Sequence, residues 1–212
     1  MTQEQWLQDR KTGIGASDAA AVLGLNPWMS NHQLWLEKTG RVTPEDISNK
    51  PYVQYGINAE PHLRALFALD NPQYNVRHTP YKIIRHPTKP YIFATPDGEL
   101  EEISTGRRGG LEIKTTEIIR SSDWDQWNER IPDHYYIQAL HQMLAAQWDY
   151  VVLLAQIKYT ARNGERQKIT KQYLIERSDV QEDIDYVEEK VTYFWEYNVL
   201  QDVQPALILP AI

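Results

Sequence analysis

Two acidic residues and one lysine in the middle of the sequence have the types and spacing of a metal-assisted hydrolytic site. Asp97 lies in a Thr-Pro-Asp-Gly turn that follows an aromatic and β-branched run. Further along, Glu112 and Lys114 flank Ile113 in a second run typical of a strand, so alternation places both side chains on one face and Ile113 towards the core. The glycine-containing connection at 104–110 predicts a hairpin that brings Asp97 beside Glu112. Two carboxylates and an ammonium group at one sheet end suit a hard divalent cation and the water that it activates.

Each half of this pattern also has an ordinary structural explanation. An Asp-Gly pair after proline is a common turn, and a Glu-x-Lys sequence is a common solvated strand face. Together and in this order, however, Asp97, Glu112 and Lys114 resemble the P-D-(D/E)-x-K signature of the restriction-endonuclease-like nucleases. The resemblance implies an α/β fold with a restriction-endonuclease-like core, in which a central mixed β-sheet is flanked by helices.

Composition restricts the classes of protein that fit. The 212 residues include 42% hydrophobic residues and no cysteine, which predicts one compact domain over residues 1–212 and excludes disulfides and thiolate metal sites. The polar N-terminus is unlike a signal peptide and no apolar run is long enough to span a membrane, so we expect a soluble cytoplasmic protein without a membrane partner. The net charge of −7 argues against indiscriminate adhesion to nucleic acid, although a local basic surface can still bind a phosphate backbone.

The N-terminal region contains a candidate anion site. Gly13 and Gly15 interrupt the chain, after which Ser17 is predicted to cap a helix at 18–23. Free N–H groups at such a helix start favour an anion, and the guanidinium of Arg10 could close over it. From the local sequence alone the structural interpretation is favoured, with Ser17 as a cap and Arg10 as a surface charge.

Two further polar residues accompany predicted helices. Glu60 precedes Pro61, and since proline is tolerated in the first turn of a helix, we expect Glu60 near the start of a helix through 62–67, where the helix dipole favours a carboxylate. A helix from about residue 133 has a core stripe of Ile137, Leu140 and Leu144. Gln138 lies off this stripe and could reach the edge of the sheet that carries the acidic residues.

The remaining pattern alternates helices and strands, as expected for an α/β fold. The sequence predicts a helix at 31–38, a strand-like region at 75–87 paired with 91–95, and a doubly covered strand at 151–157. A strand at 170–175 and a final helix at 180–200, opened by Ser178, follow. The sequence leaves two roles open: the 101–110 loop either contacts DNA or only closes a hairpin, and the apolar tail at 205–212 covers either its own core or a neighbouring subunit.

The combined motifs resemble one family. Trp6, Arg10 and the Gly-Ile-Gly-Ala-Ser-Asp stretch at 13–18 are similar to the opening motif of the lambda-exonuclease/YqaJ family of phage recombination nucleases, and the spacing of Tyr135 and Gln138 is similar to the helix after its catalytic strand. The resemblance implies that Arg10 and Ser17 bind the 5′-phosphate of a DNA end. It also implies an acidic residue near the metal, here Glu60, and a glutamine at the active site, here Gln138.

The resemblance therefore implies a Mg²⁺-dependent 5′→3′ exonuclease on double-stranded DNA ends, with Mn²⁺ as a substitute. Asp97 and Glu112 would bind the metal together with the main-chain carbonyl of Ile113, Glu60 is a further candidate ligand, and Lys114 would orient the water. By resemblance, the protein acts in recombination as a ring-shaped trimer with a single-strand-annealing protein, in a bacterial cytoplasm and encoded by a phage or prophage. A structure- or site-specific endonuclease of the same fold and a non-catalytic DNA-end-binding module remain alternatives.

Overall fold

The computed structural model describes residues 1–209, apart from the side chains of Ser121 and Ser122. The strands are β1 Ile14–Gly15, β2 Tyr74–Arg77, β3 Ile84–Arg85, β4 Ile92–Ala94, β5 Gly98–Glu102, β6 Arg108–Ile118, β7 Tyr150–Thr160 and β8 Arg166–Glu176. The α-helices are α1 Gln3–Asp9, α2 Ala16–Val22, α3 Asn31–Lys38, α4 Pro51–Asp70, α5 Asp133–Ala146 and α6 Gln181–Tyr193. Short 3-10 segments are η1 Arg10–Thr12, η2 Ser121–Trp127 and η3 Arg177–Asp179, and a π-helical turn, η4, covers Phe194–Val199.

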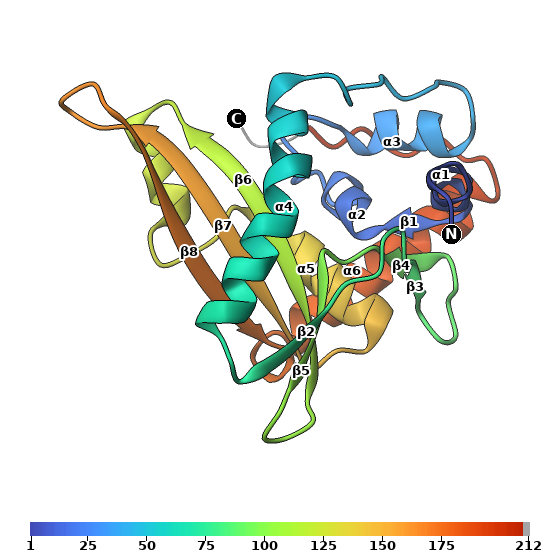
Figure 1. Cartoon of the computed structure of the whole chain (residues 1–212). Helices are drawn as coiled ribbons and strands as arrows, with labels where there is room; N and C mark the ends of the chain where they lie inside the picture. Colours follow the sequence, from blue (N-terminus) through green and yellow to red (C-terminus); the bar gives the residue numbers. More distant parts are fainter. Residues whose placement is uncertain (210–212) are drawn as a thin grey trace.

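The centre of the fold is a five-stranded mixed sheet in the order β2-β5-β6-β7-β8 (Figure 1). β5 and β6 form an antiparallel hairpin, β6 and β7 run parallel, and β8 returns antiparallel to β7. A parallel pair needs a long crossover connection, which η2 and α5 supply between β6 and β7. The predicted α/β fold with a central mixed sheet flanked by helices is therefore confirmed.

Helices cover both faces of this sheet. α4 packs Leu63 and Phe67 onto one face, against residues such as Leu111 and Val152. The opposite face carries η2 and α5, because alternate residues of β6 and β7 turn that way. Residues 150–155 of β7 are buried, as their apolar sequence predicts for a strand covered on both sides, whereas the end of the strand is partly exposed.

The N-terminal elements form a second layer against α5. A three-stranded sheet in the order β1-β4-β3 and the helices α2, α3 and α6 share one apolar core with α5. Helix α3 has the predicted bounds, and its Trp35 is buried with its indole N–H donating to the Asn198 carbonyl at 2.9 Å. This layer places the N-terminal motif beside the edge of the central sheet.

The prediction for Glu60 and Pro61 is wrong in its secondary structure. Helix α4 begins at Pro51 and continues to Asp70, so Pro61 lies inside the helix and Glu60 lies at its centre. Proline within a helix costs about 3 kcal/mol and removes one hydrogen-bond donor. Here the buried side chains of Leu63 and Phe67 on the same helix supply packing that offsets this cost.

Two other boundaries differ from the prediction. The region at 75–87 is two separate strands, because β2 pairs with β5 in the central sheet while only β3 pairs with β4. The final helix α6 ends at Tyr193 and continues as the π-helical turn η4, and Ser178 lies in η3 with its hydroxyl on Asp179 at 3.0 Å instead of capping α6.

The structure shows contacts for the two segments whose roles the sequence does not decide, the 101–110 loop and the C-terminal tail. Arg107 of the 101–110 loop forms an ion pair with Glu176 at the end of β8. In the tail, Asn31 donates to the Ala206 carbonyl at 2.7 Å and accepts from the Ile208 N–H at 3.0 Å, so residues 206–208 pack on their own chain. Residues 210–212 of the tail lie outside the described part. Within residues 1–209, no helix is both long and apolar enough to cross a membrane.

We expect His141 to make the free energy of unfolding depend on pH. His141 is fully buried on α5 and contacts the Ile14 carbonyl at 3.1 Å, and burial lowers its pKa to about 4 despite the opposing Asp18 carboxylate. Between pH 6.5 and 4 the unfolded chain binds the proton and the folded chain does not, so this group removes about 3 kcal/mol of stability as the pH falls through that window.

Urea unfolding at several pH values measures this effect. His141→Gln keeps a donor for Ile14 without titrating in this range, so its stability should fall less steeply between pH 6.5 and 4. If the unfolding free energies of the two proteins change equally with pH, the pH dependence does not come from His141.

Candidate active site

Asp97 directly precedes β5, which is shorter than its neighbour β6 in the sheet. The β5–β6 pairing ends at Gly98 opposite Leu111, whereas β6 continues towards Ile118. The Ile113 N–H therefore lies beyond β5, and it donates to the Asp97 carboxylate at 2.7 Å. Since the N–H and C=O of a strand residue point to the same side, the Ile113 carbonyl also faces Asp97. As predicted, the hairpin brings Asp97 next to the Glu112–Lys114 segment.

Glu112 is a buried carboxylate with a partner for each oxygen. Its side chain is 2% exposed, and it accepts hydrogen bonds from Gln138 at 2.6 Å and from Gln142 at 2.5 Å. Lys114 lies on the same strand face, with its Nζ 2.6 Å from the Glu112 Oε1 atom and 5.0 Å from the centre of the Tyr135 ring. The predicted positions of Glu112, Lys114 and Gln138 at one edge agree with the structure.

The charges of this cluster are only partly balanced. Burial raises the pKa of Asp97 well above its ordinary value, and the neighbouring Glu112 and Glu60 carboxylates raise it further, against the effect of Lys114 and of the Ile113 N–H. Burial alone would lower the pKa of the Lys114 ammonium, but Glu112 and Asp97 raise it overall. Lys114 balances one of the two carboxylates Asp97 and Glu112, and Arg64 pairs with Glu60, so one acidic group is left without a compensating cation, which favours a further cation.

These residues fit a small divalent cation. Among residues 1–209, no three acidic or histidine side chains gather closely enough to form a complete metal cage. Mg²⁺ usually needs less, because it keeps several water ligands and binds through one or two carboxylates plus substrate phosphate oxygens. Asp97, Glu112 and the Ile113 carbonyl supply such a set of hard oxygen donors.

Glu60 lies in the same cavity but has a partner of its own. Arg64, one turn further along α4, is 2.7 Å from the Glu60 carboxylate and donates to the Asp97 main-chain carbonyl at 2.6 Å. His78 also contacts this carbonyl, at 3.0 Å. The turn that presents Asp97 is thus fixed to α4 from one side and to the segment after β2 from the other.

The N-terminal pair, Arg10 and Ser17, lines the same cavity. The Arg10 guanidinium donates to the Ser17 hydroxyl at 3.1 Å, so the structure brings together the two residues that the N-terminal motif singles out. The prediction that Ser17 caps the helix is wrong: Gly15 is the N-cap residue of α2, and Asp18 accepts the Gly15 N–H at 3.1 Å. Because Asp18 satisfies the cap, the exposed Ser17 hydroxyl remains directed to Arg10.

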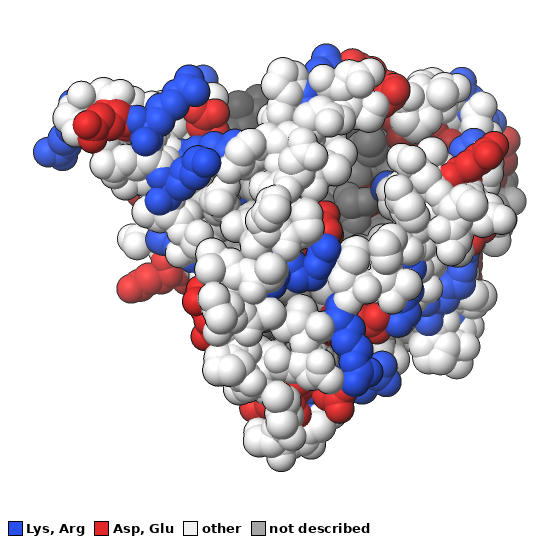
Figure 2. Space-filling model, in the orientation of Figure 1, with Lys and Arg blue, Asp and Glu red and all other residues white. Residues whose placement is uncertain are grey.

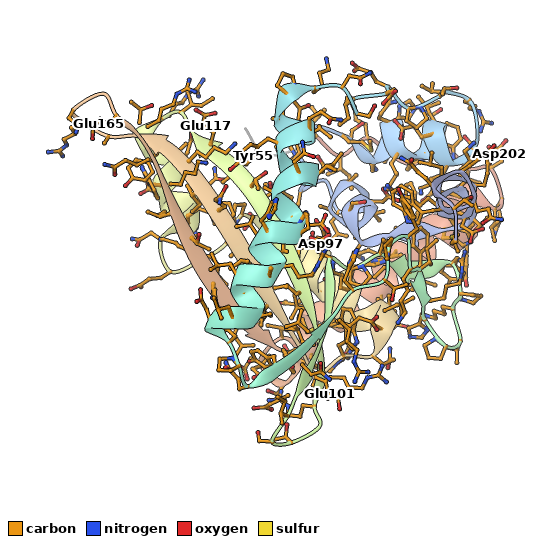
Figure 3. All side chains as sticks on the ribbon, in the orientation of Figure 1. Tyr55, Asp97, Glu101, Glu117, Glu165 and Asp202 are labelled. Carbon is orange, nitrogen blue, oxygen red and sulfur yellow. The ribbon has the colours of Figure 1, made fainter. Side chains whose placement is uncertain are left out.

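One cavity of about 630 Å³ connects both groups. Its lining includes every site residue that the sequence analysis names: Arg10, Ser17, Glu60, Asp97, Glu112, Ile113, Lys114 and Gln138. Figure 3 shows Asp97 on the side of α4 that faces the N-terminal elements. The arrangement can hold a cation at Asp97 and Glu112 and an anionic group at Arg10, within one space.

Sequence reasoning missed Gln142 and Arg64. Gln142 is completely buried and contacts Glu112, and it follows Gln138 by four residues on α5. That spacing places both amides on one helix face, and it is the signal that could have identified Gln142. Arg64 follows Glu60 at the same spacing on α4, but its contact with the Asp97 carbonyl depends on the tertiary fold.

The chain shares its fold with exonucleases of known structure. An alkaline exonuclease from Laribacter hongkongensis superposes with a TM-score of 0.68 at 20% identity, over 95% of this chain and 94% of that chain. The same enzyme in complex with dAMP gives 0.60 at 21% identity, over 91% and 96% of the chains. A phage-related exonuclease from Haemophilus somnus 129PT gives 0.56 at 14% identity, over 85% and 90%.

The family follows from sequence comparison. Residues 5–149 match the model of the YqaJ-like viral recombinase domain, so the chain belongs to this family. The uncharacterised protein YqaJ of Bacillus subtilis (strain 168) is 32% identical over 207 residues, which are 98% of this chain. The chain spans 60% of the length of that relative.

We expect Asp97→Asn to raise the stability of the metal-free protein. The substitution removes a buried charge that Glu112 and Glu60 oppose, while the amide oxygen can still accept the Ile113 N–H. Thermal unfolding in EDTA at neutral pH should show a melting temperature higher by a few degrees. Asp125 is exposed, so Asp125→Asn serves as the control and should leave the melting temperature unchanged. A lower melting temperature for Asp97→Asn would contradict the conclusion that the charge at Asp97 is unbalanced.

Proposed function

We propose that this protein is a divalent-metal-dependent 5′→3′ exonuclease that degrades double-stranded DNA from 5′-phosphorylated ends. The observation that carries the proposal is the single cavity in which Asp97, Glu112 and Lys114 face the Arg10–Ser17 pair. A cation site alone would serve many hydrolases. A cation site with a separate phosphate-sized anion site beside it suits cleavage next to a terminal phosphate.

The residues of the chain would divide the chemistry among them. Asp97, Glu112 and the Ile113 carbonyl would hold Mg²⁺, or Mn²⁺ in its place, with Glu60 near enough to contact a metal-bound ligand. The ion would lower the pKa of a water molecule and neutralise charge on the scissile phosphate. Lys114 would orient the attacking water and stabilise the negative charge that develops on phosphorus. Gln138 and Gln142 hold Glu112 in position through its two oxygens.

Arg10 and Ser17 would seat the 5′-phosphate of the DNA end. Lys38 is 2.7 Å from the Asp18 carboxylate and Arg10 is 3.8 Å from it, so this group carries one net positive charge. A hydroxyl and a planar guanidinium offer several donors to phosphate oxygens. The Laribacter hongkongensis exonuclease, which shares this fold, has been solved in complex with dAMP, and this supports a nucleotide as a ligand of the present chain.

A basic surface on the β7–β8 hairpin supports contact with a duplex. Lys158, Arg162, Arg166 and Lys168 lie on this projecting hairpin, and none of the four forms an ion pair with a described residue. Figure 2 shows Lys and Arg on the hairpin with a few acidic side chains among them, and Figure 3 labels Glu165 there. The Lys158 ammonium lies 3.0 Å from the centre of the Tyr55 ring. Figure 3 shows Tyr55 on the side of α4 away from Asp97. Unpaired cations attract the phosphate backbone even though the whole chain is acidic.

The wider biological setting is also part of this proposal. We infer that residues 1–212 act as one nuclease domain, assembled as a ring-shaped trimer in the bacterial cytoplasm during phage-type recombination. A single-strand-annealing protein would take over the single strand that the exonuclease exposes. Membership of the YqaJ-like viral recombinase family supports this setting.

A direct assay tests the activity. With Mg²⁺, linear duplexes bearing 5′-phosphates should release mononucleotides, whereas 5′-hydroxyl ends should react more slowly and covalently closed circles should remain intact. EDTA should stop the reaction. Lys114→Ala should lower kcat by about a hundredfold or more while DNA binding persists, because the variant loses the group that stabilises the transition state. Cleavage of circles would favour an endonuclease, and an undiminished rate for Lys114→Ala would refute its catalytic role.

The phosphate site has its own test. Arg10→Ala should reduce the preference for 5′-phosphate over 5′-hydroxyl ends by about tenfold or more, since a hydrogen bond to a charged group contributes about 1.5–3 kcal/mol. The neighbouring Lys11 is exposed and does not line the cavity, so Lys11→Ala should keep the preference. The measurement is kcat/KM on the two substrates, and an unchanged ratio for Arg10→Ala would remove Arg10 from the phosphate site.

A further inference from the structure

The mouth of the cavity carries a tyrosine in an unfavourable backbone conformation. Tyr81, in the segment between β2 and β3, has a φ of +58°, in the left-handed region that residues with large side chains rarely adopt. Its side chain is 37% exposed and lines the same cavity as Asp97 and Arg10. Strained residues in a binding cavity persist only where the surroundings fix them, and they mark candidate functional positions.

The surroundings of Tyr81 do fix it. Three residues before it, His78 contacts the Asp97 carbonyl at 3.0 Å, and directly after it Lys82 binds both oxygens of Glu99, at 2.6 and 2.8 Å. The segment is thus attached on both sides of Tyr81 to the residues that flank Gly98 at the start of β5. The position of the Tyr81 ring is therefore coupled to the turn that presents the Asp97 carboxylate.

Trp6 lines the same cavity and contacts the Tyr81 ring. The two ring centroids are 5.9 Å apart with their planes tilted by 51°. The Trp6 indole N–H donates to the Thr95 hydroxyl at 3.1 Å, two residues before Asp97, and the Arg10 guanidinium lies 4.8 Å from the Trp6 ring. Trp6 consequently contacts the proposed phosphate ligand, the turn of Asp97 and the Tyr81 ring.

This geometry restricts where the base of a bound nucleotide can lie. If the 5′-phosphate rests on Arg10 and Ser17 while the next phosphodiester lies at Asp97 and Glu112, the sugar spans the cavity between them. The base then lies against other residues of the lining. Among the tryptophan, tyrosine and phenylalanine side chains of this lining, Tyr81 is exposed, whereas Trp6 is half-buried and Phe93 is buried.

We propose that Tyr81 is the stacking surface for the base of the 5′-terminal nucleotide, and that Trp6 positions it. This inference rests on the proposed function and adds a base subsite to it. Stacking accepts every base, because each base has a π-face, so it suits an enzyme that removes successive nucleotides regardless of sequence. The rigid attachment of Tyr81 fixes the base and so helps to align the linkage on its 3′ side with the cation site.

Paired substrates test the subsite. Two duplexes with 5′-phosphates differ only in the terminal nucleotide, which carries a base in one and is abasic in the other. Wild type should favour the intact nucleotide, and Tyr81→Asn should lower kcat/KM for that substrate by about 5- to 100-fold, which matches the loss of one base–aromatic contact. The abasic substrate should react equally with both proteins. Asparagine tolerates a positive φ, so Tyr81→Asn removes the ring without adding strain.

Two controls separate stacking from a general defect. Tyr81→Phe should keep the preference, and Tyr186→Ala, at an exposed tyrosine on α6 outside the cavity, should behave as wild type. If wild type and Tyr81→Asn show the same ratio of rates on the two substrates, the base subsite is refuted while the exonuclease activity stands.

A binding measurement tests the subsite without cleavage. In EDTA, a duplex with 5′-phosphorylated 2-aminopurine at the terminal position is titrated with protein. Because stacking on an aromatic ring quenches this base, emission should be lower in the wild-type complex than in the Tyr81→Asn complex. If the emission differs in this way but no nucleotides are released in Mg²⁺, the exonuclease activity is refuted and the base subsite is retained. Equal emission in the two complexes would refute the subsite.

Discussion

The burial of the Glu112 carboxylate is the constraint on which the rest of the site depends. A charged group that is 2% exposed is tolerated only if hydrogen bonds and an opposite charge replace water. Lys114 supplies the charge, and Gln138 and Gln142 supply one amide donor for each oxygen. These contacts determine which face of α5 packs on β6. They also determine the position of α5 along that strand. The polar groups of the proposed site thus also fix how the crossover helix packs on the sheet.

A difference in strand length creates the position of the second carboxylate. β6 extends past the first residue of β5, so the Ile113 N–H and C=O lack a neighbouring strand on that side. A buried N–H without a partner is costly, and Asp97 satisfies it from the turn. The remaining carbonyl and carboxylate oxygens then share one small space, where Glu112 and Glu60 raise the pKa of Asp97 further. Beside β6, where β5 begins, the sheet therefore carries a cluster of oxygen donors, and the Lys114 ammonium does not neutralise its negative charge.

The sequence predicted backbone periodicity correctly, but it did not predict features that depend on packing between distant elements. Alternation placed Glu112 and Lys114 on one face, and helical spacing placed Gln138 off the core stripe, because both depend only on backbone periodicity. Pro61 misled the prediction of α4, since packing of Leu63 and Phe67 outweighs the local preference of proline for a first turn. Ser17 was a plausible cap, but α2 begins earlier, at Ala16 with Gly15 as its N-cap, and the sequence does not tell where the first turn starts. The contacts of Gln142, Arg64 and Tyr81 depend on distant elements meeting.

The distribution of charge reconciles an acidic protein with a DNA substrate. Asp97, Glu112 and Glu60 line the proposed point of cleavage, so a phosphodiester there is repelled until a divalent cation reverses the local sign. The flanks are different: Arg10 and Lys38 exceed Asp18 by one charge on one side, and the β7–β8 hairpin carries unpaired cations on the other. In the proposed function, the DNA backbone would be attracted to both flanks, while its approach to the centre would depend on the cation. Cleavage would then depend on the seating of a DNA end, and general adhesion along DNA would contribute little to it.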